Sequence, residues 1–237
     1  QIYGRRQGHR LRPERRRLLA EFLPKLQLEL PASGRLDPAA LFPERRQHLW
    51  LEIGFGAGEH LAAQAAAHPE VGLIGCEPYV AGVARLLAAA ERARLDNLRL
   101  VVDDARLLLH ALPDSCLERV FVLFPDPWPK TRHHKRRIVN PATAVEFARL
   151  LAPGGELRLA TDDMGYARAM SLTLSARPEL AWLAERPADW RQRPPDWPAT
   201  RYEQKAAAAG RPAVYLRYRR QTQPGSGRAP AADEKRP

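Results

Sequence analysis

The segment Leu51-Glu52-Ile53-Gly54-Phe55-Gly56-Ala57-Gly58-Glu59 decides the fold of this chain. An apolar strand-like run ends in glycines at alternate positions, and a helix-like segment follows at once. Glycine allows a tight turn and lets a ligand approach the backbone, while a helix N-terminus presents unpaired N–H groups. The segment therefore predicts a nucleotide-type cradle, although glycines in a purely structural turn give the same pattern.

The residue after this turn limits what the cradle can hold. The dinucleotide-binding fingerprint places its third glycine where this chain has Glu59. A carboxylate close to the turn repels a pyrophosphate. The turn therefore favours a ligand without phosphates and argues against a nicotinamide-dependent oxidoreductase.

Strand and helix patterns alternate outward from this segment. We expect strands at residues 49–53, 71–76, 98–102, 120–124 and 156–161, and helices at 59–68, 80–95 and 141–151. Repeated βα units predict a mostly parallel sheet with helices on both faces. Further along, a helix at 166–176, a short strand at 180–184 and a Pro/Trp-rich loop at 186–200 precede a half-buried strand at 213–219. This seventh strand is predicted to run antiparallel, at the end of a seven-stranded α/β sheet.

The ends of the chain differ from its centre. Residues 1–47 are predicted to form a basic N-terminal arm and a helix, interrupted at Pro24, that docks on the core. Residues 48–220 form the α/β domain, and residues 221–237 are expected to be a disordered, dispensable tail. No apolar run reaches the roughly 18 residues of a membrane span, so we expect a cytoplasmic protein without membrane attachment. Cys76 and Cys116 are expected to be reduced thiols.

The positive charge is concentrated in two segments. Residues 5–17 hold seven arginines and one acid, and residues 130–137 hold five cations and no acid. The positive charges of these two segments exceed their negative charges by 11, which equals the formal net charge of the chain, +11. The rest of the chain is therefore neutral in total. Such local patches favour nucleic acid or another polyanion as a partner over a solvated or membrane-facing surface.

Acidic residues accompany five successive strands of the predicted sheet. They are Glu52, Glu77, Asp103 with Asp104, Asp126, and Asp162 with Asp163. Because the ligand crevice of an open α/β sheet lies at the carboxyl ends of its strands, we expect these carboxylates to converge. They suit ribose hydroxyls, an exocyclic amine and a cation, a combination that describes S-adenosylmethionine. Each acid alone is also compatible with a solvated loop or a helix cap.

The fourth strand leads into the run Phe124-Pro125-Asp126-Pro127-Trp128-Pro129-Lys130, followed by the basic residues 131–137. Proline fixes φ and removes a hydrogen-bond donor, so this run leaves the sheet as a stiff loop that points Asp126 in a fixed direction. The loop thus joins a candidate reaction centre to a candidate polyanion site. Trp128 either stacks on a base or packs against the loop. His133 and His134 have no accompanying acid or cysteine at ligand spacing, so no metal is expected.

These blocks together resemble the bacterial tRNA (guanine-N7)-methyltransferase family, Rossmann-like class I enzymes that use S-adenosylmethionine. The resemblance covers roughly residues 3–220 and rests on segments 4–8, 51–58, 125–138, 160–162 and 200–203, and on Gly210. It implies methyl transfer to N7 of guanine in tRNA, forming 7-methylguanosine in the variable loop at tRNA position 46. This chain departs from the family at Tyr202, where Phe is usual, and at Asp103, before the cofactor acid.

The resemblance and the turn together give a set of candidate site residues. The expected cofactor contacts are Glu52, Gly54, Gly56, Gly58, Glu77, Asp104 and Asp126. The expected substrate contacts are Lys130, Asp162, Thr200, Arg201, Tyr202 and Glu203. The expected RNA contacts are Arg5, Arg6, Arg132, His133, His134, Lys135, Arg136 and Arg137.

Asp126 is the catalytic candidate. Guanine N7 has a lone pair and no proton, so methyl transfer to it needs alignment and charge stabilisation but no general base. Two other functions stay open, an exocyclic-amine methyltransferase and an RNA-binding protein that keeps the fold without catalysis. The expected partner is tRNA, bound by a monomer or a homodimer.

Overall fold

The computed structural model describes residues 11–42, 44, 46 and 48–222. Arg5, Arg6 and residues 223–237 of the expected tail lie outside the described residues. The centre is a seven-stranded sheet in the order β3-β2-β1-β4-β5-β7-β6. Its strands are β1 (His48–Ile53), β2 (Val71–Cys76), β3 (Leu98–Val101), β4 (Leu117–Leu123), β5 (Leu151–Thr161), β6 (Leu180–Trp182) and β7 (Val214–Arg220).

The first five strands run parallel, and β7 runs antiparallel to both of its neighbours, β5 and β6. The expected mostly parallel sheet is therefore confirmed. The C-terminal strand is antiparallel, as expected, and it is inserted between β5 and the short edge strand β6. The strand order reverses between β1 and β4, and such a switch point is where open α/β sheets bind ligands.

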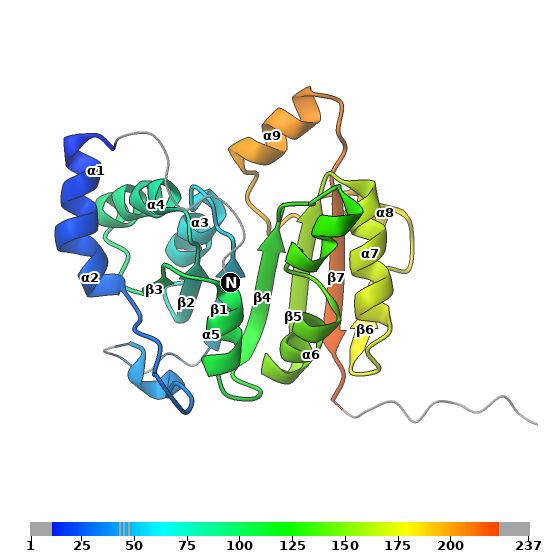
Figure 1. The fold of residues 1–237 in the computed structure, drawn as a ribbon, viewed down its shortest axis with the longest axis horizontal. Coiled ribbons are helices and arrows are strands. Elements are labelled where there is room, and N and C mark those ends of the chain that lie inside the picture. The colour runs from blue at the N-terminus through cyan, green and yellow to red at the C-terminus, as the bar shows by residue number, and fades with distance from the viewer. Residues whose placement is uncertain (1–10, 43, 45, 47, 223–237) are drawn as a thin grey trace, which may run out of the picture.

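Helices cover both faces of the sheet, and each face has its own core (Figure 1). On one face lie α5 (Ala105–Ala111), α6 (Pro141–Leu150) and α7 (Met164–Ser175), packed around Phe147 and Met170. On the other lie α3 (Glu59–Ala67) and α4 (Val80–Ala93), packed around Leu86. The two-residue period of a strand explains the division, because Leu51 joins the first core and its neighbour Trp50 joins the second.

The N-terminal helical segment packs on the second core, as expected. It consists of α1 (Pro13–Arg17), a π-helical turn (Leu18–Phe22) and α2 (Leu23–Leu26). Leu18 is fully buried, and Arg17 forms an ion pair with Glu91 of α4. Pro24 does not break the segment, because the preceding turn widens so that the Leu23 N–H bonds to the Leu18 carbonyl.

The remaining elements are short. Two 3-10 helices span Pro38–Ala40 and Thr131–Arg136, α8 spans Ala188–Arg191, and α9 spans Arg201–Ala208. In Figure 1, α9 lies beyond the carboxyl ends of β4 and β5.

Within the described residues no helix is both long and apolar enough to span a bilayer. Cys76 and Cys116 are free thiols, as expected, and burial raises the pKa of Cys116 to about 11.

Candidate active site

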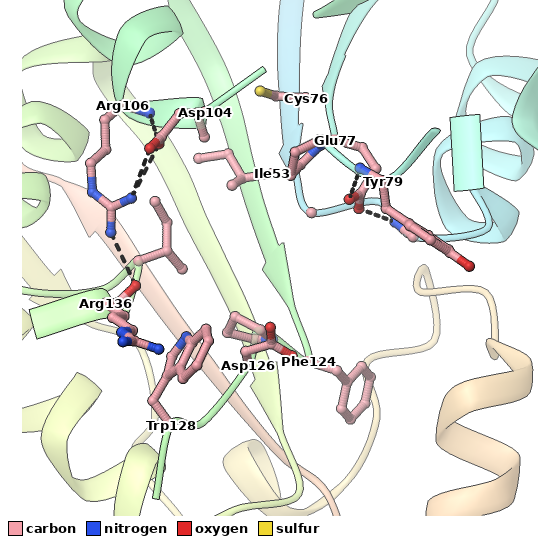
Figure 2. Close-up of a pocket in the computed structure, with 16 residues that line it drawn as sticks. Ile53, Cys76, Glu77, Tyr79, Asp104, Arg106, Phe124, Asp126, Trp128 and Arg136 are labelled. Carbon is pink, nitrogen blue, oxygen red and sulfur yellow. Dashed lines mark hydrogen bonds and ion pairs between the residues drawn. The ribbon is translucent and has the colours of Figure 1, made fainter. Parts of the chain in front are cut away.

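A cavity of about 460 Å³ opens at the carboxyl ends of the first four strands. It lies at the switch point, with Gly54 following β1, Glu77 following β2, Asp104 following β3 and Asp126 following β4. Figure 2 shows Asp104, Glu77 and Asp126 on three sides of this space. The sequence prediction that these three acids converge is therefore confirmed.

The glycine turn forms one wall of the cavity. Gly54 and Gly56 line it with positive φ angles of 71° and 54°, and a Cβ on either residue would meet no atom within 4 Å. The backbone is thus open to a ligand at both positions. Gly58 does not line the cavity. A Cβ there would lie 2.6 Å from Leu86, so this third glycine lets α4 pack against the turn.

Glu77 stiffens this wall. Its carboxylate accepts hydrogen bonds from the backbone N–H groups of Gly56, at 2.8 Å, and Tyr79, at 2.9 Å. Burial raises the pKa of Glu77, these two hydrogen bonds oppose the shift, and the nearby charges of Asp126 and Glu52 add to it. Each carboxylate oxygen keeps a lone pair beyond its backbone bond, so Glu77 can still accept from ligand hydroxyls.

The Asp104 side of the cavity is joined to the basic run through Arg106. Asp104 caps α5 by accepting from the Arg106 N–H, and it also pairs with the Arg106 guanidinium at 3.1 Å. The same guanidinium donates to the carbonyl oxygens of Arg136 and Arg137, at 3.1 and 3.3 Å. Arg106 lines the cavity and was not predicted from the sequence. Its place two residues after Asp104, in the first turn of α5, is the one signal that could have indicated it.

The proline-rich loop holds Asp126 between two strained residues. Phe124 and Trp128 both have positive φ, 50° and 44°, a conformation that bulky residues rarely adopt. Phe124 is fixed there by a 2.8 Å bond from its N–H to the Ala160 carbonyl of β5. Backbone strain of this kind persists only where the surroundings impose it, and it is concentrated at functional sites. Asp126 is exposed on this rigid support and lines the cavity.

Trp128 packs within its own loop. The Arg136 guanidinium lies 4.9 Å from the centre of the Trp128 ring, and His133 meets the ring edge-on at 5.9 Å. Burial, with the charge of Arg136 and its neighbours, lowers the pKa of His133. Of the two roles left open by the sequence, the structure favours packing. Trp128 and Arg136 together close the cavity on this side.

Two of the predicted substrate residues, Tyr202 and Asp162, meet beside Phe124, which lines the cavity. The Tyr202 ring lies 5.0 Å from the Phe124 ring, and its hydroxyl donates to Asp162 at 3.2 Å. Arg211, not predicted from the sequence, donates to the other oxygen of Asp162 at 2.8 Å. Thus residues that follow β4 and β5 meet α9 at one place. The hydroxyl by which Tyr202 departs from the family has a defined partner.

Thr200 and Glu203 fix the start of α9. The Thr200 hydroxyl accepts from the Glu203 N–H at 3.2 Å and caps the helix. The Glu203 carboxylate pairs with Arg193 at 3.2 Å and accepts a hydrogen bond from the Tyr215 hydroxyl. Within the predicted substrate set these two residues therefore have structural partners that hold α9 in place.

The basic run divides into two kinds of residue. Lys130, Arg132 and Lys135 are exposed, and His134 is partly exposed. Arg137 differs from the prediction for an RNA contact, because it is only 9% exposed. Its guanidinium stacks 4.6 Å from the centre of the Tyr166 ring and donates to the Pro127 carbonyl. Arg137 thus braces the loop that carries Asp126.

Glu52 also lies elsewhere than predicted. It is 3% exposed and does not line the cavity, and its carboxylate lies 2.7 Å from the His60 Nδ1. Ile53, the next residue along β1, does line the cavity, and successive strand residues point to opposite faces. The expectation that the Glu52 side chain contacts a cofactor in this cavity is therefore not supported. Gln64 extends the buried network to the Asp196 carbonyl, at 3.1 Å.

Two other strand-end acids accept from backbone N–H groups close to them in sequence, and Asp163 caps α7 in this way. Asp163 accepts from the Tyr166 N–H at the start of α7, at 2.7 Å, and Asp103 accepts from the Asp104 N–H, also at 2.7 Å. Within the described part of the chain, no three His, Cys, Asp or Glu side chains are arranged to hold a metal ion. The acids that line the cavity are Glu77, Asp104 and Asp126.

This donor set fits S-adenosylmethionine. Three carboxylates line the space together with Arg106, which pairs with Asp104, and Arg136. The carboxylates suit a ligand with hydroxyl, amine and sulfonium groups. The open glycine backbone allows close approach, and the volume is that of a pocket for a drug-sized ligand.

Comparison with known proteins agrees with this geometry. Residues 46–216 match a family model described as "Putative methyltransferase". Among solved structures, the aminoglycoside resistance methyltransferase NpmB1 has a TM-score of 0.50 at 16% identity, over 74% of this chain and 88% of that chain. The 16S rRNA methyltransferase KamB gives 0.50 at 14%, over 74% and 89%. These likenesses identify the fold as that of class I methyltransferases.

Curated relatives are much closer in sequence. The tRNA (guanine-N(7)-)-methyltransferase of Rhodospirillum rubrum is 55% identical over 239 residues, covering 98% of this chain and 94% of its own length. The protein of the same name from Nitrobacter hamburgensis is 48% identical, over 93% of this chain and 87% of the relative. That from Zymomonas mobilis is 46% identical, over 92% and 94%. The chain belongs to the tRNA (guanine-N(7)-)-methyltransferase family.

Proposed function

We propose that this protein transfers the methyl group of S-adenosylmethionine to N7 of a guanine in tRNA, forming 7-methylguanosine. One observation carries the proposal. The loop that places Asp126 at the cavity also places Phe124 against Tyr202 of α9 and leads directly into the basic run. A cofactor cavity, an aromatic edge and a polyanion surface therefore meet at one loop.

The bound cofactor supplies an electrophilic methyl group on a positively charged sulfur. Glu77 would hold the ribose, because its carboxylate lies beyond β2 and keeps lone pairs, beyond its backbone bonds, that can accept from hydroxyls. Asp104, which follows β3, would accept from the adenine amine. Gly54 and Gly56 let the cofactor lie against the backbone, where a side chain would fill the space.

The chain needs no general base, because guanine N7 carries no proton. Its task is to hold the base in line and to stabilise the positive charge that develops on the purine. Asp126 does both by accepting from the N1–H or amino edge of the guanine, which turns N7 toward the methyl group. Phe124 and Tyr202, whose rings contact each other, form an aromatic edge beside the base, and Asp162, fixed by Arg211, accepts from its remaining donors.

Exposed cations beside the loop bind the tRNA backbone. Lys130, Arg132 and Lys135 lie along the 3-10 helix that follows the proline-rich loop, and phosphate contacts of this kind position a nucleic acid without reading its sequence. Arg5 and Arg6, which lie outside the described residues, are also proposed to contact the tRNA. We place the methylated guanine in the variable loop of the tRNA, and the reaction in the cytoplasm, where tRNA is found.

The experiment that tests this function is incubation with methyl-labelled S-adenosylmethionine and unmodified tRNA, followed by digestion to nucleosides. The expected product is labelled 7-methylguanosine, and digestion of the same tRNA to oligonucleotides should place the label at a single position in the variable loop. A label on an exocyclic amine would keep the fold and overturn the base chemistry. Cofactor binding without transfer would point to an RNA-binding protein.

A further inference from the structure

Glu59 links the glycine turn to the substrate helix. One oxygen of its carboxylate accepts from the backbone N–H of Arg201 at 2.7 Å, and the other lies 3.2 Å from the Arg201 Nε. The two residues are 142 positions apart in the chain. This contact joins the first residue of α3 to the first residue of α9. The site described above does not use it.

The turn at one end of this contact is rigid. Gly58, the residue before Glu59, has a φ of 75° and packs closely against Leu86 of α4. Gly56, two residues earlier, is held by the Glu77 carboxylate. The position of the Glu59 carboxylate is therefore set by the same packing that shapes the cofactor wall.

The helix at the other end has little packing of its own. In α9 only Ala206 is buried, and the Arg201 side chain is 85% exposed. A short helix with one buried residue gains little stability from packing, so its orientation depends on polar contacts at its ends. Those contacts are Glu59 at Arg201, the Thr200 cap, the Tyr202–Asp162 bond and the Glu203 pairs with Arg193 and Tyr215.

We propose that Glu59 is a positioning residue that fixes α9 against the cofactor turn, so that Tyr202 is held ready for the guanine before tRNA binds. The inference rests on the proposed function for its consequence on tRNA. The geometry itself does not depend on that function.

The negative charge of Glu59 separates the proposed positioning role from a simple surface-charge effect. A carboxylate near a polyanion site repels tRNA, so its removal should strengthen tRNA binding if Glu59 is only a surface charge. A positioning role predicts that removal of Glu59 weakens tRNA binding. Without Glu59, α9 is loose and must be ordered when tRNA binds, and that ordering lowers the observed affinity.

The test compares Glu59→Ala and Glu59→Gln with wild type and with Glu70→Ala. Glu70→Ala makes the same change in net charge as Glu59→Ala. The Glu70 side chain is 61% exposed and lies just before β2, away from the start of α3 where Glu59 lies. For Glu59→Ala we expect the KM for tRNA to rise roughly tenfold, the scale of a lost charge-assisted hydrogen bond, with kcat largely retained. Glu59→Gln should be intermediate because its amide oxygen still accepts from the Arg201 N–H.

Two further measurements complete the test. Cofactor affinity by calorimetry should be unchanged in both Glu59 variants, which excludes damage to the turn. Hydrogen exchange in the free enzyme should accelerate over residues 201–204 in Glu59→Ala and not in Glu70→Ala. An unchanged exchange rate, or tRNA binding as tight as wild type or tighter, would overturn the inference. A wild-type enzyme inactive on tRNA would instead overturn the proposed function, and the exchange result would still test the contact.

Discussion

Arg137 donates a hydrogen bond from its Nε to the carbonyl oxygen of Pro127, 2.8 Å away. The bond reaches from the end of the basic run back into the loop that carries Asp126. The sequence shows five cations together, and the structure shows that this one braces the loop.

Removal of Arg137 should therefore damage the loop without the signature of a lost phosphate contact. We expect Arg137→Ala to lower the melting temperature and the turnover while the salt dependence of tRNA binding keeps its slope. The double variant Arg132→Ala with Lys135→Ala should retain its stability and reduce the slope by roughly 2, one for each phosphate contact. Binding measured over a range of salt, with thermal denaturation alongside, distinguishes the two. A flattened slope for Arg137→Ala would contradict the bracing role.

Asp126 should affect turnover more than tRNA binding. We expect Asp126→Asn to lower kcat by about 10²-fold or more, since it removes a preorganised charge at the reacting base. Asp37→Asn makes the same substitution at a carboxylate that does not line the cavity, and it should leave kcat unchanged. Single-turnover kinetics with saturating tRNA and cofactor measure the effect. Near-normal turnover in Asp126→Asn would refute its role.

Cofactor affinity should depend on the ionisation of Glu77. Burial raises the pKa of this carboxyl above its ordinary 4.5, so protonation begins at a higher pH than for an exposed glutamate. Without cofactor, ionisation of the buried Glu77 lowers the free energy of unfolding as pH rises above the ordinary pKa of 4.5. Protonation of Glu77 at lower pH restores that stability. The ionised form is the one that accepts two hydroxyls, so cofactor binding should weaken as pH falls through the raised pKa.

Calorimetry from about pH 8 to about pH 5 measures this dependence. The variant Glu77→Gln should bind the cofactor weakly, with a flatter profile over the same range. If wild type and Glu77→Gln weaken in parallel as pH falls, another group is responsible.

The buried Glu52–His60 pair should matter for stability. Glu52 and His60 are 3% and 2% exposed, so removal of the imidazole leaves a buried carboxylate without its partner. We expect His60→Ala to reduce the free energy of unfolding by about 3–5 kcal/mol. His48→Ala, at the exposed start of the same strand, is the matched control, since its 3.5 Å contact with Glu118 lies at the surface. Equal denaturation midpoints for the two variants would show that the pair contributes nothing.

The sequence predicts the sheet well because its strands are apolar runs separated by clear turns. The strand at Val71–Cys76 has the predicted bounds, and α3 and α6 begin at the predicted residues. The helix α9 is not predicted as a helix, because with a single buried residue it has no hydrophobic period to detect. Its first turn is bonded to Glu59 and Asp162, which are remote in sequence.

The sequence predicts those residues of the candidate site that follow the carboxyl end of a strand. Glu77, Asp104 and Asp126 meet there because parallel strands end at one edge. Glu52 lies inside β1, where the alternation of side chains and not the strand end decides which face a residue joins, so the sheet edge does not place it in the cavity. Arg106 and Arg211 were missed because each acts through a partner brought close only by folding.

The central claim is that the acceptor atom is N7 of guanine. The most direct test is a tRNA transcript in which 7-deazaguanosine replaces guanosine, so that a carbon stands where N7 would be. We predict that this tRNA receives no methyl group and competes with unmodified tRNA for the enzyme, because the edge that Asp126 contacts is intact. Methyl transfer to the 7-deaza transcript at the rate of the unmodified one would show that another atom accepts the methyl group, and would contradict the account.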